Sequence, residues 1–253
     1  MCLASAGSRM PEENPDIALP PGIIAVLGDS PTRSRDHEGR SGSVEFVDGG
    51  FWMKRGPAAV AEQPRLNWLA GKGIPVPPIV AFEQDVLILA DIGAPSLSAA
   101  ADESVGATLG TVLRRLHAIP IAECPFDGRL DVVLERARHQ VEQGLVDPED
   151  MDNDHYGLTP EQVLDRLYAE RPEETDLVVA HGDYTSGNVL RGGIVLDVGA
   201  LGIADRYRDL ALARRDLLDH HGPGQVEEFF AAYGLTDPDP VRLDYYRLLD
   251  ELF

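Results

Sequence analysis

The stretch HGDYTSGN, residues 181–188, decides how the rest of this sequence is interpreted. It follows the apolar run 177–180, and a second apolar run after it ends at Asp197, in the sequence DVG. A surface Asx turn and an unrelated aspartate would explain either half alone. Taken together, Asp183 is placed to accept a proton from an attacking hydroxyl, while Asn188 and Asp197 offer the hard oxygen ligands that Mg²⁺ prefers. The spacing therefore predicts phosphoryl transfer.

Two features nearer the N-terminus would complete such a site. Residues 38–43, EGRSGS, form a Gly/Ser-rich loop whose backbone N–H groups could cover phosphates. Lys54 ends the mostly apolar run FWMK, where it could pair with the phosphates of a nucleotide, and Glu62 lies close enough in sequence to hold it. Considered alone, ordinary hairpin glycines and a lysine reaching for the surface explain these features equally well.

The order of the elements predicts an α+β fold with two lobes. Residues 22–91 form a β-rich nucleotide-binding lobe, and residues 92–253 a mainly helical lobe with the catalytic loop and the acceptor site. Proline is tolerated only in a first helical turn, so Pro64 predicts a helix that begins near Glu62, which leaves the Lys54–Glu62 pair uncertain. We expect strands at 22–28, 77–82, 85–90, 176–180 and 193–199, a hairpin at 41–54 turning at 48–50, and helices at 65–73, 104–119, 130–144, 158–170, 204–220, 223–233 and 241–252.

Composition excludes several classes of protein. The net charge of −21 disfavours a nucleic-acid binder, and it would attract a cationic partner or serve solubility alone. No apolar run is long enough to span a membrane and no secretory signal is evident, so we expect a cytoplasmic protein. Cys2 and Cys124 have no metal-ligand spacing and are expected to be free thiols. Residues 1–21 are expected to be a mobile tail.

Several longer stretches resemble the aminoglycoside 3′-phosphotransferases, antibiotic kinases with a protein-kinase-like fold. The most specific are VVAHGDYTSGNVL (178–190), VLDVGALGIADRYRDLALARRDL (195–217) and YYRLLDELF (245–253). RLNWLAGKGIPVP (65–77), LRRLHAIPIAECPFDGRL (113–130) and GLVDPEDMDNDHYGL (144–158) are similar in the same order, so the resemblance covers roughly residues 38–253.

The resemblance implies transfer of the γ-phosphoryl group of ATP, or of GTP, to a hydroxyl of an aminoglycoside, with Mg²⁺, giving antibiotic resistance. It implies that Asp183 is the catalytic base and that His181 and Asp209 are structural. We expect the protein to be a monomer or a weak dimer. The implied metal ligands are Asn188 and Asp197. The implied nucleotide-binding residues are Lys54, Glu62, Ser41, Gly42, Ser43, Leu89, Asp91 and Ile92. The implied acceptor-binding residues, most of them acidic as a cationic drug requires, are Asp150, Asp152, Arg215, Asp216, Asp219, Glu251 and Phe253.

The acceptor side departs from the family pattern. Ala200 stands where the family usually has Arg, and Asn153 and His220 stand where acidic residues are common. A kinase for another small hydroxylated amine therefore stays open as an alternative. A nucleotide-binding protein without catalysis is the alternative from another class, and the intact Asp183, Asn188 and Asp197 argue against it.

Overall fold

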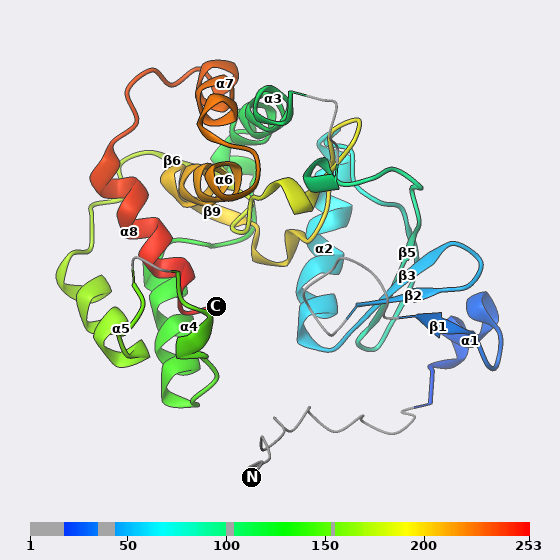
Figure 1. Cartoon of the computed structure of the whole chain (residues 1–253). Coiled ribbons are helices and arrows are strands. Elements are labelled where there is room, and N and C mark those ends of the chain that lie inside the picture. Colours follow the sequence, from blue (N-terminus) through cyan, green and yellow to red (C-terminus); the bar gives the residue numbers. More distant parts are fainter. Residues whose placement is uncertain (1–17, 35–43, 100–103, 153–154) are drawn as a thin grey trace, which may run out of the picture.

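The computed structural model describes residues 18–34, 44–99, 104–152 and 155–253. The loop residues Ser41, Gly42 and Ser43, residue Asn153, and the expected tail as far as residue 17 lie outside these ranges. The described chain forms the two lobes that the sequence predicts, one built on an antiparallel sheet and the other mainly helical (Figure 1). None of the helices in these ranges is long and apolar enough to cross a bilayer.

The sheet lobe carries a helix on each face. Its strands, in spatial order β1-β2-β3-β5-β4, span Arg33–Ser34, Val44–Val47, Phe51–Arg55, Val86–Ala90 and Ile79–Glu83. The predicted hairpin at 48–50 joins β2 to β3 and is confirmed. Alternation along the strands sends Met53 and Ile88 to one small core, while the cross-strand partners Lys54 and Leu87 face the other side.

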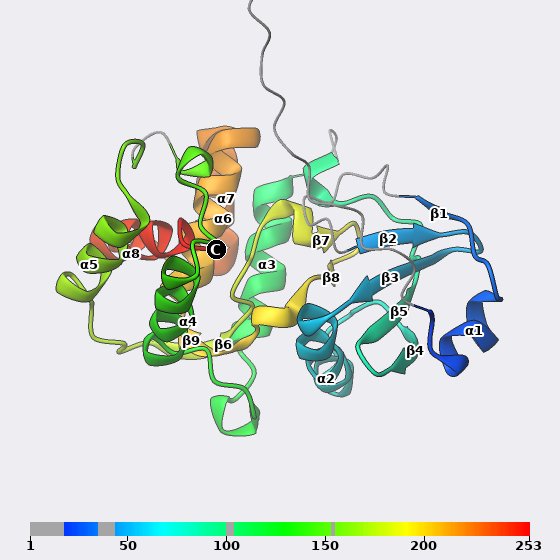
Figure 2. The ribbon, with the colours of Figure 1, turned by 90° about the horizontal axis from the view of Figure 1, so that it is seen from below.

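The first helix, α1 (Pro21–Leu27), replaces the predicted strand at 22–28, which was wrong. A short apolar run has the same pattern in a buried strand and in a short helix. Pro21 lies in the first turn, where its missing N–H costs nothing, and Ile23 is fully buried against the sheet core together with Leu19. Both views place α1 beside the sheet, on the side away from the helical lobe (Figures 1 and 2).

The second helix, α2 (Pro57–Gly71), begins well before the predicted start near Glu62, so this prediction was also wrong. Pro57 takes the first helical position, and Pro64 lies inside the helix. An interior proline removes one helical hydrogen bond, yet the burial of Leu66 and Leu69 in the main core outweighs that loss. The early start places Glu62 opposite strand β3.

The helical lobe agrees closely with the six helices predicted for it. The helices α3 to α8 span Val105–His117, Leu130–Glu142, Pro160–Ala169, Tyr207–His220, Pro223–Tyr233 and Pro240–Asp250. α3 and α7 are in intimate contact because Gly106 and Gly110 let their backbones meet: a Cβ on Gly110 would lie 2.3 Å from the Phe229 carbonyl oxygen. The main core runs through this lobe and continues under the sheet.

Two short ladders hold the site between the lobes. β6 (Leu177–Ala180) pairs with β9 (Gly202–Asp205), and β7 (Val189–Leu190) pairs with β8 (Ile194–Val195). The predicted strand 193–199 stops early because the chain turns at Asp197, whose φ is 52°, into a 3₁₀ turn at Val198–Ala200. The predicted helix at 204–220 starts only at Tyr207, since residues 202–205 pair with β6.

Candidate active site

The catalytic loop follows β6 and is held by a buried carboxylate. Asp209 of α6 is fully buried and accepts hydrogen bonds from the backbone N–H of His181 (2.7 Å) and of Gly182 (2.8 Å), and it pairs with His117 Nε2 (2.9 Å). Burial alone would raise the pKa of Asp209, but these donors and the nearby His181 hold it below its usual value. Asp209 therefore supports the catalytic loop by binding two consecutive backbone N–H groups.

His181 orients the next residue of the loop. Its Nδ1 accepts the backbone N–H of Asp183 (3.2 Å), and its Nε2 lies 2.8 Å from the Leu196 carbonyl oxygen, so the neutral tautomer carries its proton on Nε2. Asn188 Nδ2 donates to the Asp183 carbonyl (2.8 Å) and to Asp183 Oδ2 (3.0 Å). The Asp183 side chain is thus fixed on the loop while the residue stays exposed.

Lys54 joins the two lobes through carboxylates on both sides. Its Nζ lies 2.7 Å from Glu62 Oε2 of α2 and also pairs with Asp197 Oδ1. Burial works to lower the pKa of Lys54, but Asp197 and Glu62 outweigh it and raise that pKa above the ordinary value. The pair that the sequence left uncertain is therefore formed, and Lys54 stays charged.

Asn188 and Asp197 have the chemistry of a magnesium site. The Asn188 side chain donates both of its hydrogen bonds to Asp183 through Nδ2, so its side-chain oxygen Oδ1 remains available as a ligand. The Asp197 side chain is 47% exposed and sits in a left-handed backbone conformation that few non-glycine residues adopt. Carboxylate and amide oxygens suit Mg²⁺, so the residues present fit this ion.

The end of β5 leads into the helical lobe along the predicted adenine side. Leu89 is buried there, with Ile92 half-buried. The Asp91 carboxylate accepts hydrogen bonds from the Trp52 indole N–H (3.1 Å) and from the backbone N–H of Gly93 (3.2 Å). The Asp91 side chain therefore stiffens the connection between the lobes.

A pocket opens beside Asp183. Its volume of about 340 Å³ is at the small end for ligand sites, which suits one sugar ring better than a whole multi-ring drug. Its charged and terminal lining residues are Arg136, Asp183, Arg208, Asp250 and Phe253. Ala200 also lines the pocket, and its carbonyl oxygen would lie 2.6 Å from a Cβ on Gly182, whose φ is 88°.

An ion-pair network borders this pocket. Arg215 binds Asp250 at 2.7 Å and lies 3.9 Å from Asp152, which binds Arg247 at 2.9 Å. Burial raises the pKa of Asp250 to about 6; the Arg215 charge opposes the rise and the Asp183 charge adds to it. Of these residues, the sequence had singled out Asp152 and Arg215.

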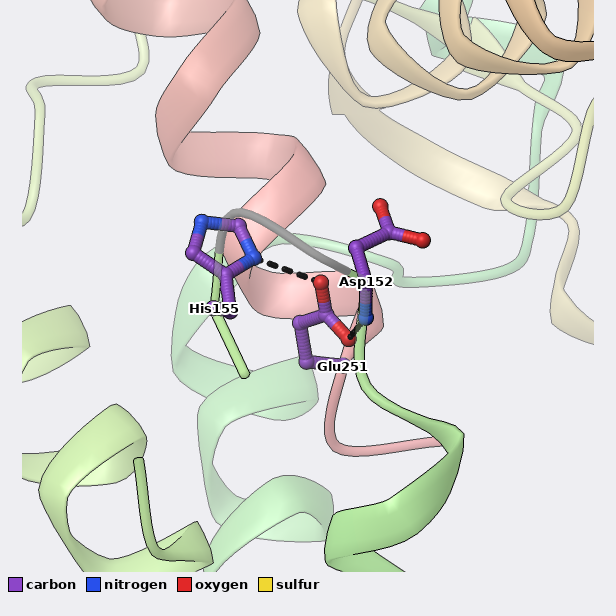
Figure 3. Close-up of side chains that lie close together, drawn as sticks. All are labelled: Asp152, His155 and Glu251. Atoms are coloured by element: carbon purple, nitrogen blue, oxygen red, sulfur yellow. Dashed lines mark hydrogen bonds and ion pairs between the residues drawn. The ribbon is translucent and has the colours of Figure 1, made fainter. Parts of the chain in front are cut away.

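Glu251 is tied to the acidic loop (Figure 3). It accepts the backbone N–H of Asp152 (3.0 Å) through Oε2, and its Oε1 lies 2.5 Å from His155 Nδ1. The three side chains have the atom types of a metal site and lie close together. However, the Asp152 carboxylate points away from the other two in Figure 3 and binds Arg247 instead, so the group serves to position Glu251.

Phe253 is the predicted acceptor residue that lines the pocket, whereas Asp152, Arg215 and Glu251 belong to the groups beside it. The other three predicted residues lie elsewhere or are only partly described. Asp216 is buried and accepts the Ser186 backbone N–H (2.8 Å), so its carboxylate braces the catalytic loop. Asp219 is exposed in the last turn of α6. Asp150 lies in the 3₁₀ turn Pro148–Asp150, and its side chain lies outside the described part of the chain.

Three charged residues of the pocket, Arg136, Arg208 and Asp250, were missed by sequence reasoning. Asp250 had a signal, because it directly precedes the predicted Glu251 in the C-terminal run that resembles the family. Arg136 had none: it lies on α4 far away in sequence, and only the fold brings it beside the C-terminal Phe253.

Comparison with known proteins agrees with this geometry. The sequence pattern described as "Phosphotransferase enzyme family" matches residues 53–246. An aminoglycoside 3′-phosphotransferase of Streptomyces fradiae is 40% identical over 210 residues, which cover 76% of this chain and 78% of that protein. The crystal structure of an aminoglycoside-3′-phosphotransferase of type VIII superposes with a TM-score of 0.82 at 33% identity, covering 91% of this chain and 97% of that one.

A second solved structure, an aminoglycoside phosphotransferase APH(3'') of Streptomyces rimosus in complex with ADP and streptomycin, gives a TM-score of 0.77 at 26% identity. It covers 91% of this chain and 95% of that one. With its kinase-like fold and these relatives, the chain belongs to the phosphotransferase enzyme family, among the aminoglycoside 3′-phosphotransferases.

Proposed function

We propose that this protein uses ATP, or GTP, and Mg²⁺ to phosphorylate a hydroxyl of an aminoglycoside, and so confers resistance to it. One observation carries the proposal: Asp183 lines an acceptor-sized pocket and is bonded to the proposed metal ligand Asn188, while the second proposed ligand, Asp197, pairs with Lys54. Asp183 is thus linked both to a residue proposed to hold Mg²⁺ and to a place for a hydroxyl.

The residues on the nucleotide side act by position and charge. Lys54 is charged, and its ion pair with Glu62 fixes the side chain in one conformation. It can therefore bind nucleotide phosphates without a further loss of side-chain entropy. Asn188 and Asp197 would hold Mg²⁺, which neutralises charge on the phosphates when it is bound. The Asp183 carboxylate, oriented by Asn188 and by the His181 ring, takes the proton of the attacking hydroxyl.

The acceptor side carries carboxylates that suit a polycation. Asp250 lines the pocket itself, while Asp152 and Glu251 are tied together just beyond it. Ammonium groups of an aminoglycoside can form charge-assisted hydrogen bonds with such groups. The 3′-hydroxyl is the first position to examine, because it is the position named for the relatives of this chain.

The test is a coupled ADP-release assay with Mg·ATP and with Mg·GTP against kanamycin, neomycin and streptomycin. We expect turnover that depends on the acceptor and falls by several orders of magnitude in Asp183→Ala, with nucleotide binding retained. Wild-type kcat in that variant would refute the role of Asp183. If the wild-type protein binds nucleotide but phosphorylates none of the panel, the proposed acceptor is wrong and other hydroxylated amines become the candidates.

A further inference from the structure

The C-terminal residue lies at the pocket although little holds it there. α8 ends at Asp250, and the last hydrogen bonds of the chain join the Leu252 N–H to the Leu249 carbonyl (3.4 Å) and the Phe253 N–H to the Asp250 carbonyl (3.1 Å). Leu252 is fully buried, but Phe253 is 52% exposed. A half-exposed ring has few packing contacts of its own, so Phe253 needs another group to keep it in place at the pocket.

Arg136 of α4 supplies that contact. Its guanidinium lies 5.3 Å from the centre of the Phe253 ring, within the range of a cation–π interaction, and both residues line the pocket. In Figure 1 the C-terminus lies beside α4. The contact therefore joins the last residue of the chain to a helix more than a hundred positions away.

Arg136 has no competing carboxylate in the described part of the chain. Arg138 binds Glu135 and Glu142 on the same helix, and Arg215 binds Asp250 beside the pocket. Arg136 forms no such ion pair within these ranges. Its positive charge also adds to burial in lowering the pKa of Arg65. The ring of Phe253 is thus the described group that the Arg136 guanidinium engages.

We propose that Arg136 is a positioning residue that holds Phe253 as a wall of the acceptor pocket. This inference rests on the proposed function for its consequence in catalysis, but the contact itself can be tested separately. Loss of Arg136 should leave the chemistry at Asp183 intact and weaken only the binding of the acceptor.

The kinetic test compares Arg136→Ala with the control Arg138→Ala, which removes the same charge from the same helix outside the pocket. We expect Arg136→Ala to raise the acceptor KM about two- to fivefold, with kcat and the nucleotide KM nearly unchanged. Arg136→Lys should restore part of the loss. An acceptor KM that is the same in Arg136→Ala and in the control would overturn the proposal.

A double-mutant cycle separates positioning from direct contact with the acceptor. If Arg136 acts through Phe253, the double variant Arg136→Ala/Phe253→Ala has the same acceptor KM as Phe253→Ala alone. Effects that multiply would mean that Arg136 meets the acceptor itself, and the proposal would be wrong. Thermal unfolding of each variant identifies any that merely fails to fold.

A second assay needs no substrate. Carboxypeptidase A releases a C-terminal phenylalanine, at a rate that follows the population of the detached end when detachment is fast. Release of Phe253 should be about two- to fivefold faster from Arg136→Ala than from wild type or Arg138→Ala. Equal rates would show that Arg136 does not hold Phe253. If the wild-type protein phosphorylates no aminoglycoside, the proposed function fails, and this assay still decides the contact.

Discussion

Replacing Asp209 by Asn tests how the catalytic loop is held. The carboxylate accepts the backbone N–H of His181 and of Gly182, one on each oxygen, and also pairs with His117. An amide of the same shape offers only one oxygen, so whichever way it is oriented its NH₂ opposes one backbone donor. His117 can adapt by moving its ring proton, but a backbone N–H cannot.

The loss of stability follows from the one backbone N–H that the amide leaves without an acceptor. One buried backbone N–H left without a partner costs about 1–3 kcal/mol, and the remaining bond loses the strengthening given by the charge. We expect the free energy of unfolding of Asp209→Asn to fall by about 2–4 kcal/mol. Because Gly182 precedes Asp183, we also expect kcat to fall, while Asp183→Asn should lower kcat with little change in stability.

Urea unfolding followed by circular dichroism measures the first effect, and the coupled assay measures the second. Asp239→Asn is the matched control, since Asp239 is an exposed N-cap of α8 and Asn caps a helix equally well. A loss of stability in Asp209→Asn no larger than in Asp239→Asn would refute the reasoning.

Three other changes have defined outcomes. Gly110→Ala should lower the free energy of unfolding by about 2 kcal/mol, because the new methyl group meets the α7 backbone. The control Gly71→Ala, which has open space around the new methyl group, should not lower it. Differential scanning calorimetry compares the two variants. Burial raises the pKa of Asp250 to about 6, so its carboxylate becomes negatively charged as the pH rises through 6. The KM of a cationic acceptor should therefore fall over that pH range. The same dependence of KM on pH in Asp250→Asn would disprove the role of Asp250. Lys54→Met leaves Glu62 buried without its partner, so the free energy of unfolding measured in urea should fall by about 3 kcal/mol. Nucleotide binding should also weaken. Wild-type stability together with wild-type nucleotide affinity would contradict the roles given to this pair.

Local patterns were sufficient for much of the helical lobe. α5 begins after the N-cap Thr159, which forms a capping box with Gln162, and has Pro160 at its first position. α3 carries its apolar residues at helical spacing. The catalytic loop could likewise be found from spacing, because Asp183 and Asn188 lie five residues apart on one loop and bond to each other directly.

Contacts between distant segments were beyond the reach of such patterns. The apolar run of α1 fits a strand as well as a helix, and only the packing of Ile23 on the sheet decides between them. Pro64 predicted a late start for α2, yet the core that buries Leu66 stabilises a longer helix. Residues 202–205 form β9 because β6 lies beside them.

The sequence by itself determined which chemical groups are available to the proposed site and their order along the chain: a lysine, an acidic acceptor side, a proposed base and two proposed metal ligands. The proposed base and metal ligands follow from their spacing, whereas the roles of the lysine and of the acceptor side are implied by the resemblance to the family. Tertiary structure alone decided that Glu62 reaches Lys54, that Asp250 enters the pocket, and that Arg136 meets the Phe253 ring. Such contacts join segments far apart in the chain, and their geometry depends on the packing of the whole core rather than on the propensity of any one segment.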